Sequence, residues 1–299
     1  MKWLKIFFIL VLLAAGGAGG YAYYLYDAAQ DAAKQMYEPG KKKPSALRDE
    51  DVSVENRDPI SILILGVDER EGDRGRTDTM MVMTVNPKAG SVLMFSIPRD
   101  TRTEIPGRGP DKINHAYAYG GVPLAMQTVE RFLHVPMDYY VKVNMEGFET
   151  IVDQLGGVDV HNEFAFHLEG YDFPEGNLHL NGAEALKYSR MRKDDPRGDI
   201  GRGERQQEVL TQVMRKAKNP SVLTKLSSIL ESLGTNVKTN LSPDELQAMA
   251  GDYRSSMNDI EPLQVNGRGE KRGGVWYYIV PEAERKRISG VLNRQLGLS

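Results

Sequence analysis

Between Lys187 and Leu210 the chain carries five arginines within sixteen positions: Arg190, Arg192, Arg197, Arg202 and Arg205. The whole chain has 299 residues and a formal net charge of −3, so this positive charge is local. A guanidinium group is planar and always charged, and its forked donors match two oxygens of a carboxylate or a phosphate. The stretch therefore indicates an anion-binding site, and phosphate suits several such donors better than a single carboxylate does.

The spacing of apolar residues predicts an amphipathic helix over residues 202–217. Its apolar stripe consists of Val209, Leu210, Val213, Met214 and Ala217. Projected back by four and by seven or eight residues, the stripe reaches Gln206 and Arg202. We expect both side chains to point inward near the start of the helix, where free backbone N–H groups and the helix dipole favour an anion.

The other charged residues of this stretch leave alternatives open. On the helix, the face away from the stripe is expected to lie in solvent, and it carries Arg205, Glu208, Gln212 and Arg215. Arg190 and Arg192 would share one face if YSRMR is extended. An inward guanidinium needs a partner, because burying an unpaired charge is prohibitive. A structural salt bridge to Asp194, Asp195 or Asp199 is the alternative to a bound phosphate.

Two aspartates form a second candidate cluster, in LGVDEREGDRGRTDTMM (65–81). Asp68 ends the apolar run ISILILGVD, which is typical of a strand covered on both faces. Asp78 lies ten residues later, just before the next strand, and Arg76 lies between the two acids. Two carboxylates at adjacent strand ends can hold a hard divalent cation such as Mg2+, which prefers oxygen ligands. Acids in loops also cap turns or pair with nearby arginines, so this alternative stays open.

Arg99 follows a further predicted strand, SVLMFSI (91–97). If this strand is a neighbour of the one that ends at Asp68, the two side chains share an edge of the sheet. The C-terminal edge of the strands is where α/β sheets place their ligands. We therefore expect the arginines and the acids to meet there.

Strands alternate with helices along the rest of the chain, which predicts an α/β fold with a mixed central β-sheet flanked by helices. Strands are expected at 60–68, 79–85, 91–97, 138–145, 158–162 and 275–280. Helices are expected at 122–135, 146–157, 181–186, 202–217, 222–233 and 242–250, with a closing helix after the last strand. Capping patterns at Asn181 with Glu184 and at Ser242 with Glu245 mark two of the helix starts.

The N-terminus predicts one transmembrane helix. Residues 6–26 carry no charge and would span roughly 31 Å as a helix, about one hydrocarbon core. Lysines precede the run, which predicts a cytoplasmic tail at 1–5, an extracytoplasmic linker at 27–58 and a domain at 59–299. The chain is thus expected in the cell membrane, single-pass, with its domain outside. A cleaved signal peptide is the alternative, since AAGGAGG offers small residues to a peptidase.

Composition and missing motifs exclude several classes of protein. The chain has no cysteine, so disulfides, thiolate metal sites and cysteine nucleophiles are excluded. It also lacks G-x-S-x-G, H-E-x-x-H, S-x-x-K and a Walker loop. The acidic net charge argues against nucleic acid as a partner. Of the five histidines, His115 follows the DKIN motif and is the one that would approach the site.

Several ordered motifs resemble the LytR-CpsA-Psr family, and most of all its wall teichoic acid members from Gram-positive bacteria. They are LILGVDER, GRTDTMMVMTVNP, FSIPRDT, DKINHAYAYGG, LGGVDV and LNGAEALKYSRMRKDDPRGDIGRGERQQ. They cover residues 60–218, and the predicted anchor precedes them as it does in the family. The resemblance implies the family's α/β fold, with a polyprenyl tail held in an apolar pocket between sheet and helices.

The resemblance also implies an activity: an extracytoplasmic phosphotransferase that moves an anionic glycopolymer from an undecaprenyl-pyrophosphate carrier to a muramic acid hydroxyl of peptidoglycan. Its partners would be this lipid-linked polymer, peptidoglycan and the cytoplasmic membrane. By motif, the metal-associated acids are Asp68 and Asp78, for Mg2+ with Mn2+ as the alternative. The pyrophosphate-binding set is Arg76, Arg99, Arg190, Arg192, Arg202 and Gln206, and the catalytic residues are Asp78, Arg99 and Arg192. Either acid of the metal pair would accept the proton, with Asp199 as a rival.

Three other functions stay open at this point. A hydrolase would use the same phosphate-binding residues to cleave the lipid pyrophosphate with water, and it would release free polymer phosphate. A transcriptional regulator is suggested by historical names in the family, but the expected extracytoplasmic location argues against it. A non-catalytic binder of anionic glycopolymer would bind without turnover.

Overall fold

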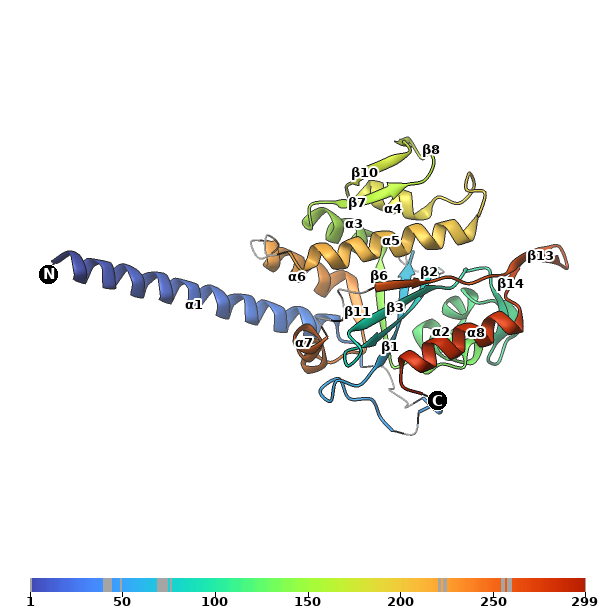
Figure 1. Cartoon of the computed structure of the whole chain (residues 1–299), viewed down its shortest axis with the longest axis horizontal. Helices are drawn as coiled ribbons and strands as arrows, with labels where there is room; N and C mark the ends of the chain where they lie inside the picture. Colours follow the sequence, from blue (N-terminus) through green and yellow to red (C-terminus); the bar gives the residue numbers. More distant parts are fainter. Residues whose placement is uncertain are drawn as a thin grey trace.

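A six-stranded mixed sheet forms the centre of the protein (Figure 1). The computed structural model describes residues 2–39, 45–48, 50–68, 75, 77–219, 222, 225–253, 256 and 260–298, with side chains from residue 19 onward. In this part of the chain the strand order is β11-β6-β1-β2-β3-β12. The strands are β1 (Ile60–Val67), β2 (Thr77–Asn86), β3 (Ser91–Ser96), β6 (Tyr139–Asn144), β11 (Val237–Thr239) and β12 (Ile260–Leu263). Because β1 runs parallel to β6 and antiparallel to β2, the predicted mixed sheet is confirmed.

Helices cover both faces of this sheet (Figure 1). One face carries α2 (His115–Leu133) and α8 (Glu282–Gln295). The other carries α3 (Met145–Gln154), α4 (Gly182–Arg190), α5 (Asp199–Ala217) and α6 (Leu226–Asn236). Every residue of β1 is buried or half-buried, as its unbroken apolar sequence predicts.

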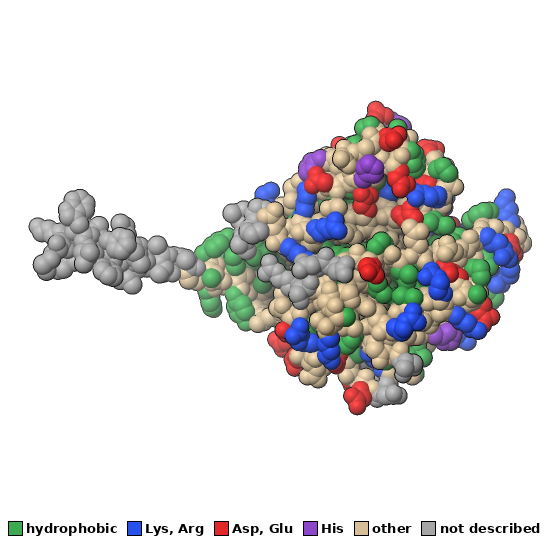
Figure 2. All heavy atoms as spheres, viewed as in Figure 1, with side chains coloured by type: hydrophobic (Ala, Val, Ile, Leu, Met, Phe, Trp, Pro, Cys, Tyr) green, Lys and Arg blue, Asp and Glu red, His purple; other side chains and the backbone are tan. Residues whose placement is uncertain are grey.

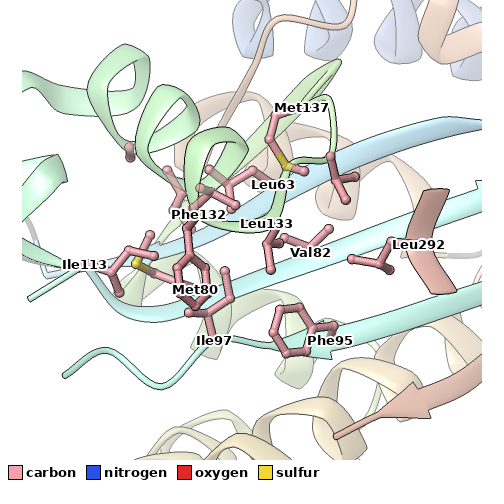
Figure 3. Close-up of a cluster of buried hydrophobic side chains, with 14 of the residues drawn as sticks. Leu63, Met80, Val82, Phe95, Ile97, Ile113, Phe132, Leu133, Met137 and Leu292 are labelled. Carbon is pink, nitrogen blue, oxygen red and sulfur yellow. The ribbon is translucent and has the colours of Figure 1, made fainter. Parts of the chain in front are cut away.

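The main core lies between the sheet and the α2–α8 layer. Figure 3 shows Leu63, Val82 and Phe95 of the strands among side chains of α2 and α8, including Leu133 and Leu292. Since strand side chains alternate between faces, the neighbours of Leu63 along β1 point toward α5 instead. A well-packed core on one face thus leaves the opposite face of the same strands available to form a cavity wall.

Four short strand pairs surround the central sheet. They are β4 (Arg102–Ile105) with β5 (Gly109–Lys112), β7 (Val158–Asn162) with β10 (Gly176–Leu180), β8 (Phe166–Leu168) with β9 (Tyr171–Phe173), and β13 (Arg268–Arg272) with β14 (Val275–Ile279). Of these strands, the sequence predicts β7 and β14. The others are no longer than these two, and they carry neither the alternating valines of β7 nor the aromatic run of β14.

Both predicted helix caps are confirmed. Asn181 and Glu184 form a capping box at the start of α4, and Ser242 and Glu245 form another at α7 (Pro243–Asp252). The helix predicted at 122–135 begins earlier, at His115, and is interrupted by non-helical backbone at two glycines directly before it. The cap residues thus fix where α4 begins, immediately before the arginine-rich stretch.

Replacing Gly182 by alanine is expected to lower the free energy of unfolding by about 1–3 kcal/mol, because the new Cβ would overpack the α3–α4 contact. That Cβ would lie 2.2 Å from the backbone oxygen of Glu149, which cannot move without shifting α3. Thermal unfolding measures the effect. The control is Gly251→Ala in α7, where a Cβ meets nothing within 4 Å, so unchanged or slightly raised stability is expected. Equal melting temperatures for the two variants would contradict the close contact.

The N-terminal helix α1 (Lys2–Met36) reaches further than the predicted span, so residues 27–36 of the predicted linker are helical. The sequence DAAQDAA has high helix propensity, and Ala32 and Ala33 are buried. Glu38 then donates its backbone N–H to the carbonyl of Thr239 in β11, at 2.8 Å. Among the described residues, no helix is long and apolar enough to cross a membrane. Most of the predicted span, 6–18, has side chains outside the described residues, so the anchor stays a prediction.

Candidate active site

A cavity of about 420 Å³ lies between the central sheet and the helices α4 and α5. All the predicted site residues except Asp68 and Arg76 line it: Asp78, Arg99, Arg190, Arg192, Arg202 and Gln206. Its remaining wall is largely apolar and includes Ile64, Met81, Val143, Phe148, Leu186 and Val209. Side chains from distant parts of the sequence thus meet in one cationic cavity, as predicted.

Asp78 reaches the cavity because a β-bulge interrupts the β1–β2 ladder. Gly66 pairs with Thr79 and Val67 pairs with Thr77, so Asp78 is the extra residue. The sequence predicts Asp78 just before the strand, whereas β2 already begins at Thr77. A bulge commonly redirects a side chain next to an active site, and here it provides the acid of the cavity wall.

Arg99 forms an ion pair with Asp78. The prediction that Arg99 shares an edge of the sheet with Asp68 assumes that β1 and β3 are neighbours. They are not neighbours, because β2 lies between them. Both strands run antiparallel to β2, so their C-terminal ends still lie at the same edge of the sheet. The acid that meets Arg99 is therefore the one on the intervening strand.

Arg202 and Gln206 face inward from α5, as the apolar stripe predicts. Their exposed fractions are 6% and 8%, and Gln206 donates to the backbone oxygen of Ser189 at 3.3 Å. The helix begins at Asp199, three residues before the predicted start. Arg202 therefore lies at the end of its first turn, where backbone N–H groups add to the positive potential.

Arg190 and Arg192 come from the end of α4 rather than from one extended segment. Arg190 is the last residue of the helix and Met191 is its extended C-cap. The Nη1 atom of Arg192 lies 3.6 Å from a carboxylate oxygen of Asp100 and 3.6 Å from one of Asp199. Both arginines line the cavity, as predicted, although the segment YSRMR is not extended throughout.

Two acids partly neutralise the arginines. Asp199 lies 3.1 Å from Arg202 as well as near Arg192, so a structural salt bridge, the alternative considered above, is also present. Asp100 accepts a hydrogen bond from Lys112 at 2.7 Å. Asp100 and Lys112 are not among the predicted site residues, although they lie in the motifs FSIPRDT and DKINHAYAYGG.

The electrostatics of the cavity favour a bound anion. Burial lowers the pKa of Arg202 to about 10; Asp199 opposes this change, while the positive charges of Arg99 and Arg192 add to it. Arg202 remains protonated at neutral pH but is held in an unfavourable, partly desolvated environment. A bound anion would relieve this cost, so anion binding and the burial of Arg202 are coupled.

Asp100 remains ionised despite its burial. Burial alone would raise the pKa of Asp100, but the hydrogen bond and charge of Lys112 and the charge of Arg99 together hold it below its usual value. A lowered carboxylate pKa means that the stabilisation is present above the unfolded pKa and is lost as the pH falls through the folded one. The ion pairs of Asp100 should therefore persist at neutral pH and fail only in acid.

Arg205 is not on a solvent-exposed face, and the prediction for this residue is wrong. Its exposed fraction is 5%, and its guanidinium donates to Asp195 at 2.7 Å and to the backbone oxygen of Met191 at 2.6 Å. The connection between α4 and α5 folds back over this side of α5 and covers it. Arg205 therefore anchors the segment that carries Arg192.

Of the two predicted metal-binding acids, Asp78 lines the cavity and Asp68 does not. Asp68 directly follows β1, but it does not belong to the residues that line the cavity, and Arg76 lies outside the described residues. The described part of the chain holds no group of three or more His, Asp or Glu side chains placed to bind a metal. His115 pairs with Asp111 at 2.9 Å and does not line the cavity.

Known proteins are similar to this chain over most of its length. The model of the LytR_cpsA_psr family matches residues 22–294. The polyisoprenyl-teichoic acid–peptidoglycan teichoic acid transferase TagU of Bacillus subtilis (strain 168) is 47% identical over 294 residues, which are 98% of this chain and 95% of that protein.

Solved structures share the fold as well. TagT bound to LIIa-WTA aligns with a TM-score of 0.74 and 32% identity, covering 87% of this chain and 98% of that one. A crystal structure from Enterococcus faecalis, described as a transcriptional regulator, aligns with a TM-score of 0.74 and 34% identity, covering 83% and 91%.

Proposed function

Since this chain belongs to the LytR_cpsA_psr family, we propose that it is an extracytoplasmic phosphotransferase that moves wall teichoic acid from an undecaprenyl-pyrophosphate carrier to a muramic acid hydroxyl of peptidoglycan. The observation that carries the proposal is the convergence of four arginines, Arg99, Arg190, Arg192 and Arg202, in one cavity. Several forked cations around one space suit a diphosphate better than a monovalent anion. The relatives named as teichoic acid transferases support the same reaction class.

The apolar wall of the cavity supports a lipid-linked donor. Met81, Phe148, Leu186 and Val209 come from the sheet and from three helices, and they line the same cavity as the arginines. An amphiphilic ligand with a diphosphate head fits a cavity that has both apolar and cationic walls. Its hydrocarbon chain would be buried against the apolar side chains, and its phosphate oxygens would accept hydrogen bonds from the arginines. We propose that the polyprenyl chain occupies this apolar part.

In the proposed reaction, the muramic acid hydroxyl attacks the phosphorus on the polymer side of the pyrophosphate. A phosphorus–oxygen bond to the acceptor forms, and the bond to the bridging oxygen breaks. Undecaprenyl phosphate leaves with that electron pair, and the hydroxyl proton passes to a carboxylate. Of the three candidate acceptors Asp68, Asp78 and Asp199, Asp78 alone lines the cavity.

The arginines would act by position and charge. Phosphoryl transfer depends mainly on aligning the reacting groups and on stabilising charge that develops on the phosphate oxygens. Arg202 is held by burial, and Arg192 by its two acidic neighbours, so both would meet the substrate without much reorganisation. Gln206 would add a neutral donor beside them.

A divalent cation is part of the proposal. Asp78 in the cavity wall and Asp68 at the neighbouring strand end supply carboxylate oxygens, which with phosphate oxygens make the donor set that Mg2+ or Mn2+ prefers. Bound there, the cation would neutralise charge on the transferred phosphate. Asp78 also holds Arg99, so the same acid would position both positive charges.

The proposal is tested by incubating the purified chain with a labelled lipid-linked wall teichoic acid and nascent peptidoglycan, with and without EDTA. We expect label on peptidoglycan only when a divalent cation is present, and Asp78→Asn should lose most of this transfer. Release of free polymer phosphate instead would identify a hydrolase. Binding without turnover would identify a polymer-binding protein, and either result would overturn the transferase assignment.

A regulator that binds DNA is not favoured. Such domains carry a broad basic surface, whereas this chain has a formal net charge of −3 and directs its arginines into a cavity shared with acids. The description of the Enterococcus structure therefore does not change the proposal.

A further inference from the structure

A second hollow, of about 390 Å³, lies apart from the catalytic cavity and is lined by four arginines: Arg102, Arg131, Arg272 and Arg285. We name it the arginine hollow. It lies where β4, the C-terminal end of α2, the β13–β14 hairpin and the first turns of α8 meet. Two acids, Glu104 and Glu282, share its wall, so positive charge is in excess.

Most of this positive charge is not neutralised. Arg272 pairs with Glu270 at 2.6 Å. For the other three arginines of the hollow, no carboxylate of the described chain lies within ion-pair distance. The two acids nearest in sequence to Arg285 pair with other residues: Glu284 with Arg287 at 2.7 Å and Glu282 with Lys286 at 2.8 Å. The hollow therefore attracts anions from solution, since three of its four guanidinium groups have no carboxylate of the described chain within ion-pair distance.

The arginine hollow is connected to the catalytic cavity by further cations. Arg102 and Lys112 are cross-strand partners in the β4–β5 pair, and each cation lies 5.9 Å from the ring centre of Tyr277. Lys112 donates to Asp100, which in turn lies 3.6 Å from Arg192 in the cavity. A row of cations, Arg192, Lys112 and Arg102, thus leads from the cavity to the hollow, with the acid Asp100 between the first two.

We propose that this row and the arginine hollow bind the polyanionic part of the donor, a chain of repeated phosphodiesters that continues from the pyrophosphate. This inference rests on the proposed function. A ligand with a single diphosphate would need only the cavity, whereas a row of separate cations matches charges repeated along a chain. The hollow would hold the polymer in place and favour donors that carry enough repeats to reach it.

The position of the hollow agrees with such a path. The β13–β14 hairpin lies at the end of the molecule opposite the N-terminus of α1 (Figure 1). Figure 2 shows Lys and Arg side chains, with a few acids between them, over this end of the protein. A polymer held by the hollow would therefore run away from α1, which is where the sequence predicts the membrane.

The test measures binding of a soluble, lipid-free glycerol phosphate polymer to the full chain by calorimetry at several salt concentrations. The test variant combines Arg102→Glu, Arg131→Glu and Arg285→Glu. The control variant makes the same change in charge at three exposed arginines elsewhere: Arg57, Arg215 and Arg294. Melting temperatures check that both variants fold, and a glutamine version of the test variant replaces it if the glutamates prevent folding.

We expect the test variant to bind the polymer roughly tenfold or more weakly than the control variant, because it loses three cationic contacts. The slope of log affinity against log salt should also fall by about two. Equal affinity for the two variants would overturn the proposal. Weakened binding of peptidoglycan fragments with unchanged polymer binding would also overturn it, since the hollow would then belong to the acceptor.

Transfer assays add a second readout. With a donor that carries many phosphate repeats, the test variant should show a raised KM, whereas with a donor lacking repeats it should match the wild type. Equal KM values for the long donor would overturn the proposal. If the wild type transfers neither donor, the proposed function fails, but the binding measurement still decides whether the hollow takes a polyanion.

Discussion

Replacing Arg192 by alanine is expected to lower kcat/KM for transfer by about a hundredfold to a thousandfold, the usual loss when one donor to developing negative charge is removed. Arg192 lines the cavity and is held between Asp100 and Asp199, so its guanidinium is positioned before the substrate arrives. Its side chain is 37% exposed, and the fold should tolerate the change. Steady-state kinetics with the lipid-linked donor, beside a thermal melt, would measure both effects.

Two further variants sharpen this prediction. Arg192→Lys keeps the charge but not the forked pair of donors, so its activity should lie between wild type and alanine. Arg294→Ala removes an exposed arginine at the end of α8, which does not line the cavity, and should leave kcat/KM unchanged. Wild-type kinetics in Arg192→Ala would remove the residue from the site.

Replacing Arg205 by alanine is expected to lower the free energy of unfolding by about 3 kcal/mol, because the buried carboxylate of Asp195 loses its nearer cation and keeps only its contacts with Arg197. The side chain of Asp195 is 0% exposed, and Arg205 is its 2.7 Å partner. For a chain of this size, the loss corresponds to a fall in melting temperature of roughly 10 °C. Calorimetry or circular dichroism would measure it.

The matched control lies on the same helix. Arg215 is exposed, so Arg215→Ala should change the free energy of unfolding by less than about 0.5 kcal/mol. A double variant, Arg205→Met with Asp195→Asn, removes both charges together and should recover part of the lost stability. If Arg205→Ala and Arg215→Ala melt at the same temperature, the buried pair does not stabilise the fold.

Arg205 and Arg215 show which side chains of α5 the sequence places correctly and which it does not. The sequence predicts Arg202 and Gln206 inside and Arg215 outside, all correctly, because the apolar stripe of α5 sets the phase of the helix. The prediction for Arg205 is wrong because the α4–α5 connection and the rings of Phe166 and Tyr188 cover this face of the helix. Helical periodicity describes one element and its main core, and it does not predict which loop covers the remaining face.

The same limit applies to the site: residue types and spacing predict which side chains belong to it, but not how they are arranged. The acids and arginines could be selected by type and spacing, and most of them meet in one cavity. The bulge that places Asp78 beside Arg99 could not be predicted, since it depends on the register between β1 and β2. Lys112 and Asp100 were also missed, because a charged pair between residues twelve apart has no periodic pattern in a sequence.

The docking of α1 has a mechanical consequence. Residues 27–36 rise about 15 Å as a helix. Ala32 and Gln35 lie beside Gly234 of α6, and Glu38 bonds to Thr239 of β11. A continuous helix that is docked in this way would restrict rotation of the rest of the protein relative to α1. If the apolar segment before it crosses the bilayer, α1 would hold the cavity at a fixed distance and orientation relative to the lipid surface. A lipid-borne substrate would then approach the cavity from a single direction.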